Sequence, residues 1–274
     1  MSNITASEVN KLRKATGAGM MDCKNALVEA NGDFELAIEN LRKKGQKVAA
    51  KRADRDSTEG AVIAMVNDDQ TKGVVISLNC ETDFVAKNES FIDLAKSFCK
   101  IALNCSTHNE LLSSNYDSMT VAEKLIEQTG VIGEKLEIGA FESISSEYVG
   151  FYIHAGNKIA TLAGLSNKFE NASDVAKNVA MQVAAMNPIA LNEDSVSKEI
   201  IEKEIEIAKE QLRAEGKPEA MLDNIAKGKL KKFFKENTLV NQAYIKDNKS
   251  SLQSYIQSEN QDCVITNFKR IALV

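Results

Sequence analysis

One arrangement of apolar segments occurs twice in this chain, and it limits the folds that the chain can adopt. The β-type runs "AVIAMV" and "VVISLN" are joined by the polar turn "NDDQTKG", and a helical apolar face follows over residues 91–102. The runs "YVGFYIH" and "KIATLAGL" repeat this pattern around the tight turn "AGN". The segment "KLEIGAF" precedes them, and a helical face that ends before Pro188 follows. Because short turns join antiparallel strands, we predict an α+β fold with two similar subdomains, each built on an antiparallel sheet.

The N-terminal segment has a helical pattern instead. Thr5 and Glu8 form a T-x-x-E capping box, and three short helical segments end at Gly17, at Gly32 and before Gly45. These segments predict a small three-helix bundle. The basic residues that follow indicate a solvated helix end and a linker, with a nucleic-acid contact as the alternative.

Residues 195–237 carry two narrow apolar stripes flanked by Glu and Lys, and the breaker "GKP" separates them. Each stripe can bury its seam against the other, so we predict an antiparallel coiled-coil hairpin that projects from the second subdomain. The tail segments "SLQSYIQ" and "CVITNFKRIALV" predict a helix and a last strand that returns to the second sheet. The predicted division is an N-terminal module over 1–55, a first α+β subdomain over 56–140, and a second over 141–274 that contains the hairpin.

Charge and hydropathy narrow the class of partner. The net charge of −5 argues against a nucleic acid or an anionic membrane as the main partner, because both require clustered Lys and Arg. No apolar run approaches the ~18 residues needed to span a bilayer. A structured pattern begins by Thr5, so we expect no leader segment and a cytoplasmic location. A protein or a small molecule is the expected partner.

Groups that could carry out covalent chemistry are scarce. The five cysteines include no C-x-x-C pair, the two histidines are far apart, and phosphate-loop, dinucleotide, zinc-protease and nucleophile-elbow motifs are missing from the sequence. We therefore predict no catalytic residue, no metal site and no cofactor. A thiol nucleophile at Cys80 with His154 as its base is the enzymatic alternative, against the interpretation that Cys80 ends a buried strand.

Phe84 lies between an aspartate and a valine in "CETDFVAKNES", where the apolar run of the second strand ends. On one continuous helix from Thr82 to Leu103, Phe84 would share the face of Phe91 and belong to the core. That face would also carry Lys87 and Asn88, which favours a core that begins only at Phe91. The pattern leaves both interpretations open: Phe84 fills the core, or it is an exposed interface anchor.

Several motifs resemble one family. The segments "NC" and "TDFVAKN", the opening "TASEVNKLRKATGAGMMDCKNALVEANGDFELAIENLRKKG", and "AMQVAAMNP", "EGKPE" and "GKLKKF" are similar to bacterial elongation factor Ts. The likeness covers almost the whole chain, and the motifs occur in the family's order. It implies an N-terminal module similar to ubiquitin-associated domains, two core subdomains and a coiled-coil hairpin in the second.

The resemblance also implies a function: a guanine nucleotide exchange factor, without covalent chemistry, for the GTPase elongation factor Tu. The family's TDF motif enters the GTPase near its nucleotide and magnesium site. The residues that correspond to this contact are Thr82, Asp83, Phe84 and Val85. No direct nucleotide binding by this chain is implied.

Further contacts with the GTPase are implied for Arg13, Met20 and Met21 in the N-terminal module, and we expect one of the two methionines to face the bundle core. A core-subdomain contact is implied for His154. Its context departs from the family, because "HAGNK" replaces a glycine-rich turn followed by arginine, and Ala243 stands where the family generally has proline. An adaptor that binds a ubiquitin-like or client protein is the alternative from another functional class.

Overall fold

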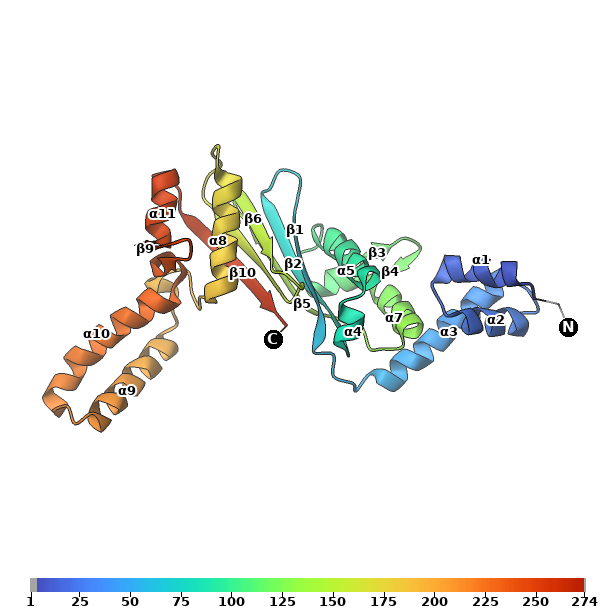
Figure 1. Ribbon diagram of the computed structural model, residues 1–274, viewed down its shortest axis with the longest axis horizontal. Helices are drawn as coiled ribbons and strands as arrows, with labels where there is room; N and C mark the ends of the chain where they lie inside the picture. Colours follow the sequence, from blue (N-terminus) through green and yellow to red (C-terminus); the bar gives the residue numbers. More distant parts are fainter. Residues whose placement is uncertain (1–3, 274) are drawn as a thin grey trace.

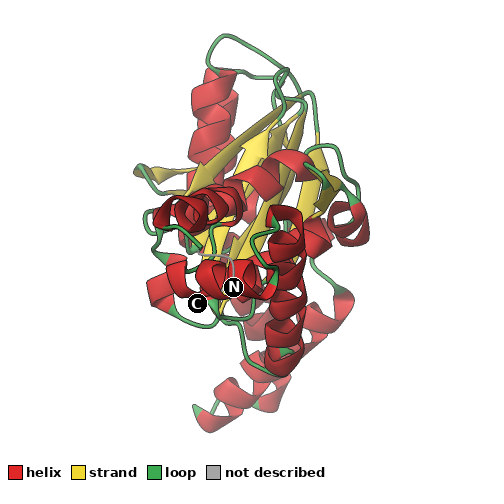
Figure 2. Ribbon diagram, turned by 90° about the vertical axis from the view of Figure 1, so that its right-hand side faces the viewer, coloured by secondary structure: helices red, strands yellow, loops and turns green. Residues whose placement is uncertain are grey.

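The structure is a computed structural model that describes residues 4–273, so the outermost residues of the predicted domains, 1–3 and 274, lie outside it. The molecule is elongated, with a helical bundle at one end, two sheets in the middle and a helical hairpin at the other end (Figure 1). Seen from the N-terminal end, the bundle lies in front of the strands (Figure 2). Within residues 4–273 the chain forms eleven α-helices and ten strands, which confirms the predicted α+β class.

The N-terminal helices are α1 (Ala6–Thr16), α2 (Met20–Glu29) and α3 (Phe34–Arg52). The predicted capping box is present, because the Thr5 hydroxyl accepts from the Glu8 backbone N–H and the Glu8 carboxylate accepts from the Thr5 backbone N–H at 2.7 Å. The third helix was predicted to end before Gly45, but it continues to Arg52. Gly45 is buried inside it, so the basic stretch expected to be a solvated helix end and a linker is helical as far as Arg52.

The first subdomain contains a sheet in the order β1-β2-β5, all antiparallel. Its strands are β1 (Glu59–Val66), β2 (Lys72–Cys80) and β5 (Glu137–Ser145). Between β2 and β5 lie α4 (Asp83–Ala86), α5 (Glu89–Ala102), α6 (His108–Ser113), the small pair β3 (Asn115–Tyr116) and β4 (Met119–Thr120), and α7 (Val121–Ile132). The segment "KLEIGAF" was grouped with the second pair of strands, but it enters β5 and pairs with β2. The boundary expected after residue 140 therefore falls within β5.

The second subdomain has a sheet in the order β10-β7-β6, also antiparallel. Its elements are β6 (Tyr148–Ile153), β7 (Ile159–Leu165), α8 (Ala172–Met186), the small pair β8 (Ala243–Tyr244) and β9 (Asp247–Ser251), α11 (Leu252–Glu259) and β10 (Ile265–Ala272). The turn between β6 and β7 uses positive φ at Gly156 (85°) and Asn157 (55°), the geometry of a tight hairpin. The predicted return of the last strand to this sheet is confirmed.

The two sheets pack face to face. In β1, Val62 and Ala64 point into a cluster shared with the second sheet, whereas Ala61 and Ile63 point toward α5. Helix α5 covers the outer face of the first sheet and α8 covers the outer face of the second (Figure 1). Because both faces of β1 and β2 are covered, their sequences are continuous apolar runs and not alternating ones.

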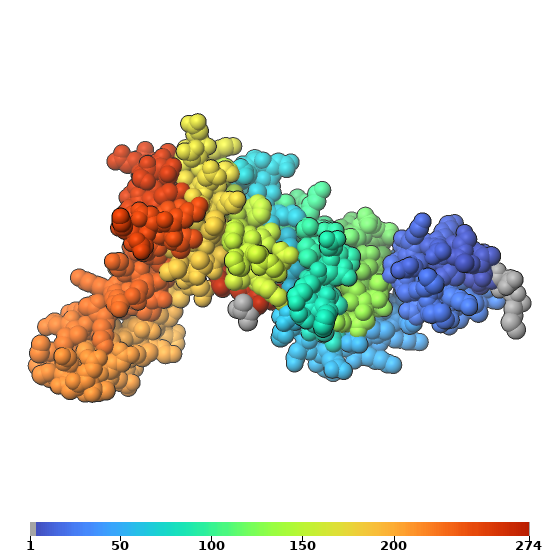
Figure 3. Space-filling view, viewed as in Figure 1, coloured from blue at the N-terminus to red at the C-terminus, as the bar shows by residue number. Residues whose placement is uncertain are grey.

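Helices α9 (Lys198–Ala214) and α10 (Glu219–Asn237) form a hairpin that projects as a separate lobe (Figure 3). Gly216, with φ of 74°, turns the chain between them. The buried seam consists of Ala208 and Leu212 from α9 and Leu222 and Ala226 from α10. Short 3-10 turns at Glu193–Ser195 and Leu239–Asn241 connect this lobe to the second subdomain.

Candidate functional site

The corner between β2 and α5 exposes the aromatic ring that the sequence left undecided. Phe84 is 85% exposed, the largest exposed fraction among the exposed large apolar side chains of residues 4–273, whereas Phe91 is buried. The continuous helix that would bury Phe84 does not form, because Lys87 and Asn88 separate the one-turn helix α4 from α5 and the Asn88 side chain caps α5. Phe84 is therefore an exposed residue and not part of the core.

The local sequence of this corner explains its shape. The Thr82 hydroxyl accepts a hydrogen bond from the Val85 backbone N–H at 3.5 Å and so caps α4. Val85 is half-buried against the first core and Ala86 is buried in it. With its last residues packed and its first residue capped, the single turn of helix presents Phe84 outward.

Asp83 carries the negative charge of the corner. Its carboxylate lies 2.6 Å from the Lys87 ammonium, one helical turn away. The hydrogen bond from Lys87 lowers the pKa of Asp83, and the same contact raises the pKa of Lys87. Asp83 is therefore ionised at neutral pH beside the exposed ring.

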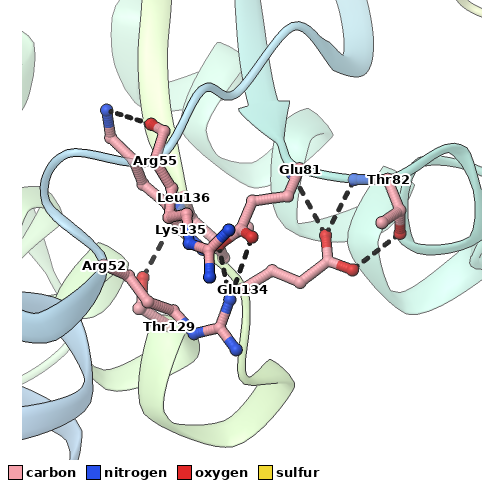
Figure 4. Close-up of polar contacts among 8 residues, drawn as sticks. All are labelled: Arg52, Arg55, Glu81, Thr82, Thr129, Glu134, Lys135 and Leu136. Carbon is pink, nitrogen blue, oxygen red and sulfur yellow. Dashed lines mark hydrogen bonds and ion pairs between the residues drawn. The ribbon is translucent and has the colours of Figure 1, made fainter.

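Behind the corner, two glutamates hold the backbone (Figure 4). The Glu134 carboxylate accepts from the backbone N–H groups of Glu81 (3.1 Å) and Thr82 (3.0 Å) and from the Thr82 hydroxyl (2.6 Å). The Glu81 carboxylate accepts from the Lys135 backbone N–H at 2.6 Å and from the Arg52 guanidinium at 2.8 and 2.9 Å. These bonds lower the pKa of Glu81, the Lys135 bond most and the Arg52 contact less.

These supporting residues were missed in the sequence. Arg52 belonged to the basic stretch expected to be a solvated helix end and a linker, and Glu81 and Glu134 are separated by 53 positions in the chain. No spacing rule relates residues 52, 81 and 134, because contacts between separate elements leave no periodic pattern in the sequence.

The enzymatic alternative has no geometric support. Cys80 is fully buried at the end of β2, its thiol donates to the Thr82 carbonyl at 3.2 Å, and burial raises the pKa of Cys80 to about 12. His154 is exposed on the other sheet, where its Nδ1 lies 3.0 Å from the Tyr152 hydroxyl. A thiol of this pKa is not a nucleophile at neutral pH.

The implied N-terminal contacts lie around the connection between α1 and α2. Arg13 is exposed in the last turn of α1, and Met20 (55% exposed) and Met21 (63% exposed) begin α2. The expectation that one methionine faces the bundle core is wrong, because Cys23, Ala26 and Leu27 fill the inward face of α2. Both methionines are available to a partner.

The structure thus presents the named residues on three separate parts of the chain: the N-terminal helices, the β2–α4 corner and the β6–β7 turn. Among residues 4–273, no cluster of three or more His, Cys, Asp or Glu side chains has the arrangement of a metal site. Across that same part of the chain, none of the helices combines the length and the apolar content that crossing a bilayer requires.

Residues 81–273 match the protein family described as Elongation factor TS. Proteins named Elongation factor Ts are similar over their full length: that of Christiangramia forsetii is 66% identical and that of Flavobacterium psychrophilum 63% identical, each covering 100% of both chains. The Elongation factor Ts of Amoebophilus asiaticus is 51% identical over 98% of both chains. With matches of this extent, the exposed Asp83-Phe84 corner lies inside the family's shared region, and the chain belongs to the elongation factor Ts family of translation elongation factors.

Proposed function

We propose that this protein binds elongation factor Tu and accelerates the release of GDP and its exchange for GTP. The observation that carries the proposal is the Phe84 ring, 85% exposed on a capped and packed helical turn. A rigid aromatic side chain can fill a partner's pocket at a small entropic cost. The Asp83-Phe84 corner, with Thr82 and Val85 shaping it, would enter the GTPase near its nucleotide and magnesium site.

The physical basis is coupling between two ligands of one GTPase. If the factor favours a GTPase conformation with a displaced magnesium site, the factor and GDP weaken each other's binding by the same ratio. Reversing a 99:1 preference requires ~5.5 kcal/mol of differential binding. Burying one phenylalanine supplies about 1.5–3 kcal/mol, so Phe84 alone is insufficient.

A second contact must therefore contribute. Arg13, Met20 and Met21 are exposed together near the start of α2 and provide an apolar anchor with a positive charge. Asp83 would act on the metal electrostatically, because an ionised carboxylate near the magnesium site alters the local field on the metal. His154, exposed at the β6–β7 turn, would supply a third contact.

The remaining features of the family follow in the same proposal. The three N-terminal helices would be a module similar to ubiquitin-associated domains, and α9 with α10 would be a coiled-coil hairpin. The protein would act by binding alone, with no covalent step, no cofactor and no direct contact with the nucleotide, in the cytoplasm.

The test is the release of fluorescent GDP from elongation factor Tu, followed by stopped flow at increasing factor concentration. We expect the parent chain to accelerate release and Phe84→Ala to reduce the acceleration about tenfold or more, a loss of ~1.4 kcal/mol in transition-state stabilisation. Met221→Ala is the matched control, because Met221 is also an exposed apolar side chain but lies on the projecting hairpin.

A parent chain that leaves GDP release unchanged at micromolar concentration would contradict the exchange function. Equal activity of Phe84→Ala and the parent would leave exchange standing but remove Phe84 as its origin.

A further inference from the structure

We propose that α7 and the turn after it act as a brace that fixes the N-terminal helices relative to the Phe84 corner, so that both surfaces reach one partner together. The brace consists of two attachments of α3: a helix crossing at Gly45 and Gly130, and a polar cluster of Arg52, Glu81 and Glu134. The proposal rests on the proposed function, in which the two surfaces touch the same GTPase. It assigns a positioning role to residues that do not touch that GTPase.

The first attachment is a backbone-to-backbone contact between α3 and α7. A Cβ atom placed on Gly130 would lie 2.4 Å from the Gly45 Cα, and one placed on Gly45 would lie 3.4 Å from the Ile126 carbonyl oxygen. Both glycines are inside helices, where each costs up to ~1 kcal/mol relative to alanine. The close approach of the two helices leaves no room for a Cβ atom at Gly130, whereas one at Gly45 would be in ordinary van der Waals contact.

The second attachment joins the end of α3 to the corner itself. Arg52 pairs with the Glu81 carboxylate, which also accepts from the Lys135 backbone, and these side chains are only 34% and 15% exposed. Next to it, Glu134 accepts three hydrogen bonds from Glu81 and Thr82 (Figure 4). Thr82, which precedes Asp83, is thus tied to the turn after α7, and Arg52 at the end of α3 is joined to that turn through Glu81.

Two attachments fix the orientation of α3 relative to the first subdomain, whereas a single attachment would let the helix pivot about it. Gly45 and Arg52 lie about 10 Å apart along α3, at ~1.5 Å per residue. The first half of α3 belongs to the N-terminal core, where Ala37 is buried, and no break separates it from the second half. Helix α3 therefore fixes where the N-terminal bundle, including Met20 and Met21 on α2, lies relative to the Phe84 corner.

The first experiment measures the geometry without a partner. Spin labels on cysteines introduced at Glu29 and Glu89, both exposed, report the distance between the N-terminal helices and the region of the corner. The five natural cysteines are buried, so the introduced ones react selectively. We expect the parent to give one narrow distance distribution, because α3 has two attachments.

Gly130→Ala is expected to broaden or shift this distribution, because the new methyl group forces the two helices apart. Gly228→Ala is the matched control: it adds the same group inside α10, where nothing lies within 4 Å of it. Arg52→Gln serves as a second variant, since it removes the partly buried charge of the second attachment and keeps the crossing. It is expected to broaden the distribution less than Gly130→Ala, and Arg52→Lys to restore most of the narrow distribution.

The second experiment measures GDP release from elongation factor Tu. Gly130→Ala and Arg52→Gln are expected to raise the factor concentration for half-maximal acceleration by about fivefold, while the rate at saturation stays within about twofold of the parent. Phe84→Ala is expected to lower the saturating rate instead. A loss of folded protein alone would not give this split, because correction for the folded fraction restores the parent's curve.

The outcomes separate the two proposals. A parent that does not accelerate GDP release contradicts the proposed function, and the distance measurement then still decides whether α3 is braced. A broad distribution in the parent, or distributions of Gly130→Ala and Arg52→Gln that match the parent, would overturn the brace. Unchanged half-maximal concentrations in both variants would overturn its role in exchange.

Discussion

The two α+β subdomains place an aromatic residue at the same distance from the end of a strand, with opposite results. In the first, Phe84 follows Cys80, the last residue of β2, by four positions and is exposed. In the second, Phe169 follows Leu165, the last residue of β7, by four positions and packs against its own core. A strand-to-helix corner of this kind therefore does not expose its aromatic residue by default.

The difference lies in what holds each corner. The first is capped by Thr82 and tied by Glu134 to the turn after α7, and the turn of α4 presents Phe84 away from the core. In the second, the Ser166 backbone N–H donates to the Val264 carbonyl at 2.9 Å, and the Phe169 carbonyl accepts from Ala172 N–H. Helix α8 has no side-chain cap at Asn171, and only a hydrogen-bonded turn at Glu170 and Asn171 leads into it, in place of a separate capped helix like α4.

Replacing each of the two phenylalanines by alanine gives the largest expected difference in stability. Phe169→Ala should lower the free energy of unfolding by about 2–4 kcal/mol, because it removes a packed ring from the second core. Phe84→Ala should change it by no more than ~0.5 kcal/mol, because its ring is already in solvent. Denaturant unfolding of both variants checks the stabilities.

The GDP-release assay should give the reverse order once each rate is corrected for the folded fraction. Phe169→Ala should then match the parent, whereas Phe84→Ala should not. A stability loss for Phe84→Ala as large as that for Phe169→Ala would show that the Phe84 ring is packed, and the comparison would fail.

Removing the caps tests why the corners differ, with a smaller expected effect. Thr82→Ala should cost ~1 kcal/mol of stability, since it leaves the Val85 N–H without its acceptor and removes one donor to Glu134. Asn171→Ala should cost much less, because this side chain makes no capping bond. Thermal unfolding monitored by circular dichroism gives both values.

Thr82→Ser is the control for this pair, because it keeps the hydroxyl and should retain most of the stability. Equal losses for Thr82→Ala and Asn171→Ala would mean that capping does not distinguish the corners.

The smallest expected effect is a pH dependence confined to the first corner. The Lys135 backbone bond, with a smaller contribution from Arg52, keeps the pKa of Glu81 below its usual 4.5 in the folded state. Its contribution to stability is therefore present above about pH 4.5 and is lost as the pH falls through the lowered folded value. The stability difference between the parent and Glu81→Gln should be measurable at pH 7 and should shrink in acid.

The bonds of the second corner come from backbone groups and from the uncharged side chains of Ser166 and Asn167. Asn167→Ala should therefore show the same stability loss at pH 7 and below pH 4. A difference for Glu81→Gln that persists unchanged below pH 4 would contradict the assigned role of its charge.

Several local features of the fold could be predicted from short sequence patterns. The capping box at Thr5, the hairpin turn at Gly156-Asn157 and the helix break near Gly216 depend on residues close in sequence, and the structure confirms each of them. The burial of Phe84 stayed open because helical periodicity places it on the face of Phe91 only if one helix is continuous through Lys87 and Asn88, and the local pattern did not decide whether it is. The continuation of α3 through Gly45 was missed because a glycine often follows the end of a helix, and the crossing of α3 with α7 at Gly130 is a contact that the local sequence does not show.

The sequence by itself determined the main strands, most of the long helices and the tight turns, but not α6, α7 or the end of α3, and its motifs identified the family, because these signals reside in short segments. The tertiary structure decided that "KLEIGAF" joins the first sheet, that the two sheets face each other, and that Glu134 holds the backbone before Asp83. Such contacts join residues far apart in the chain. They depend on how whole elements bury their apolar faces, which no single segment specifies.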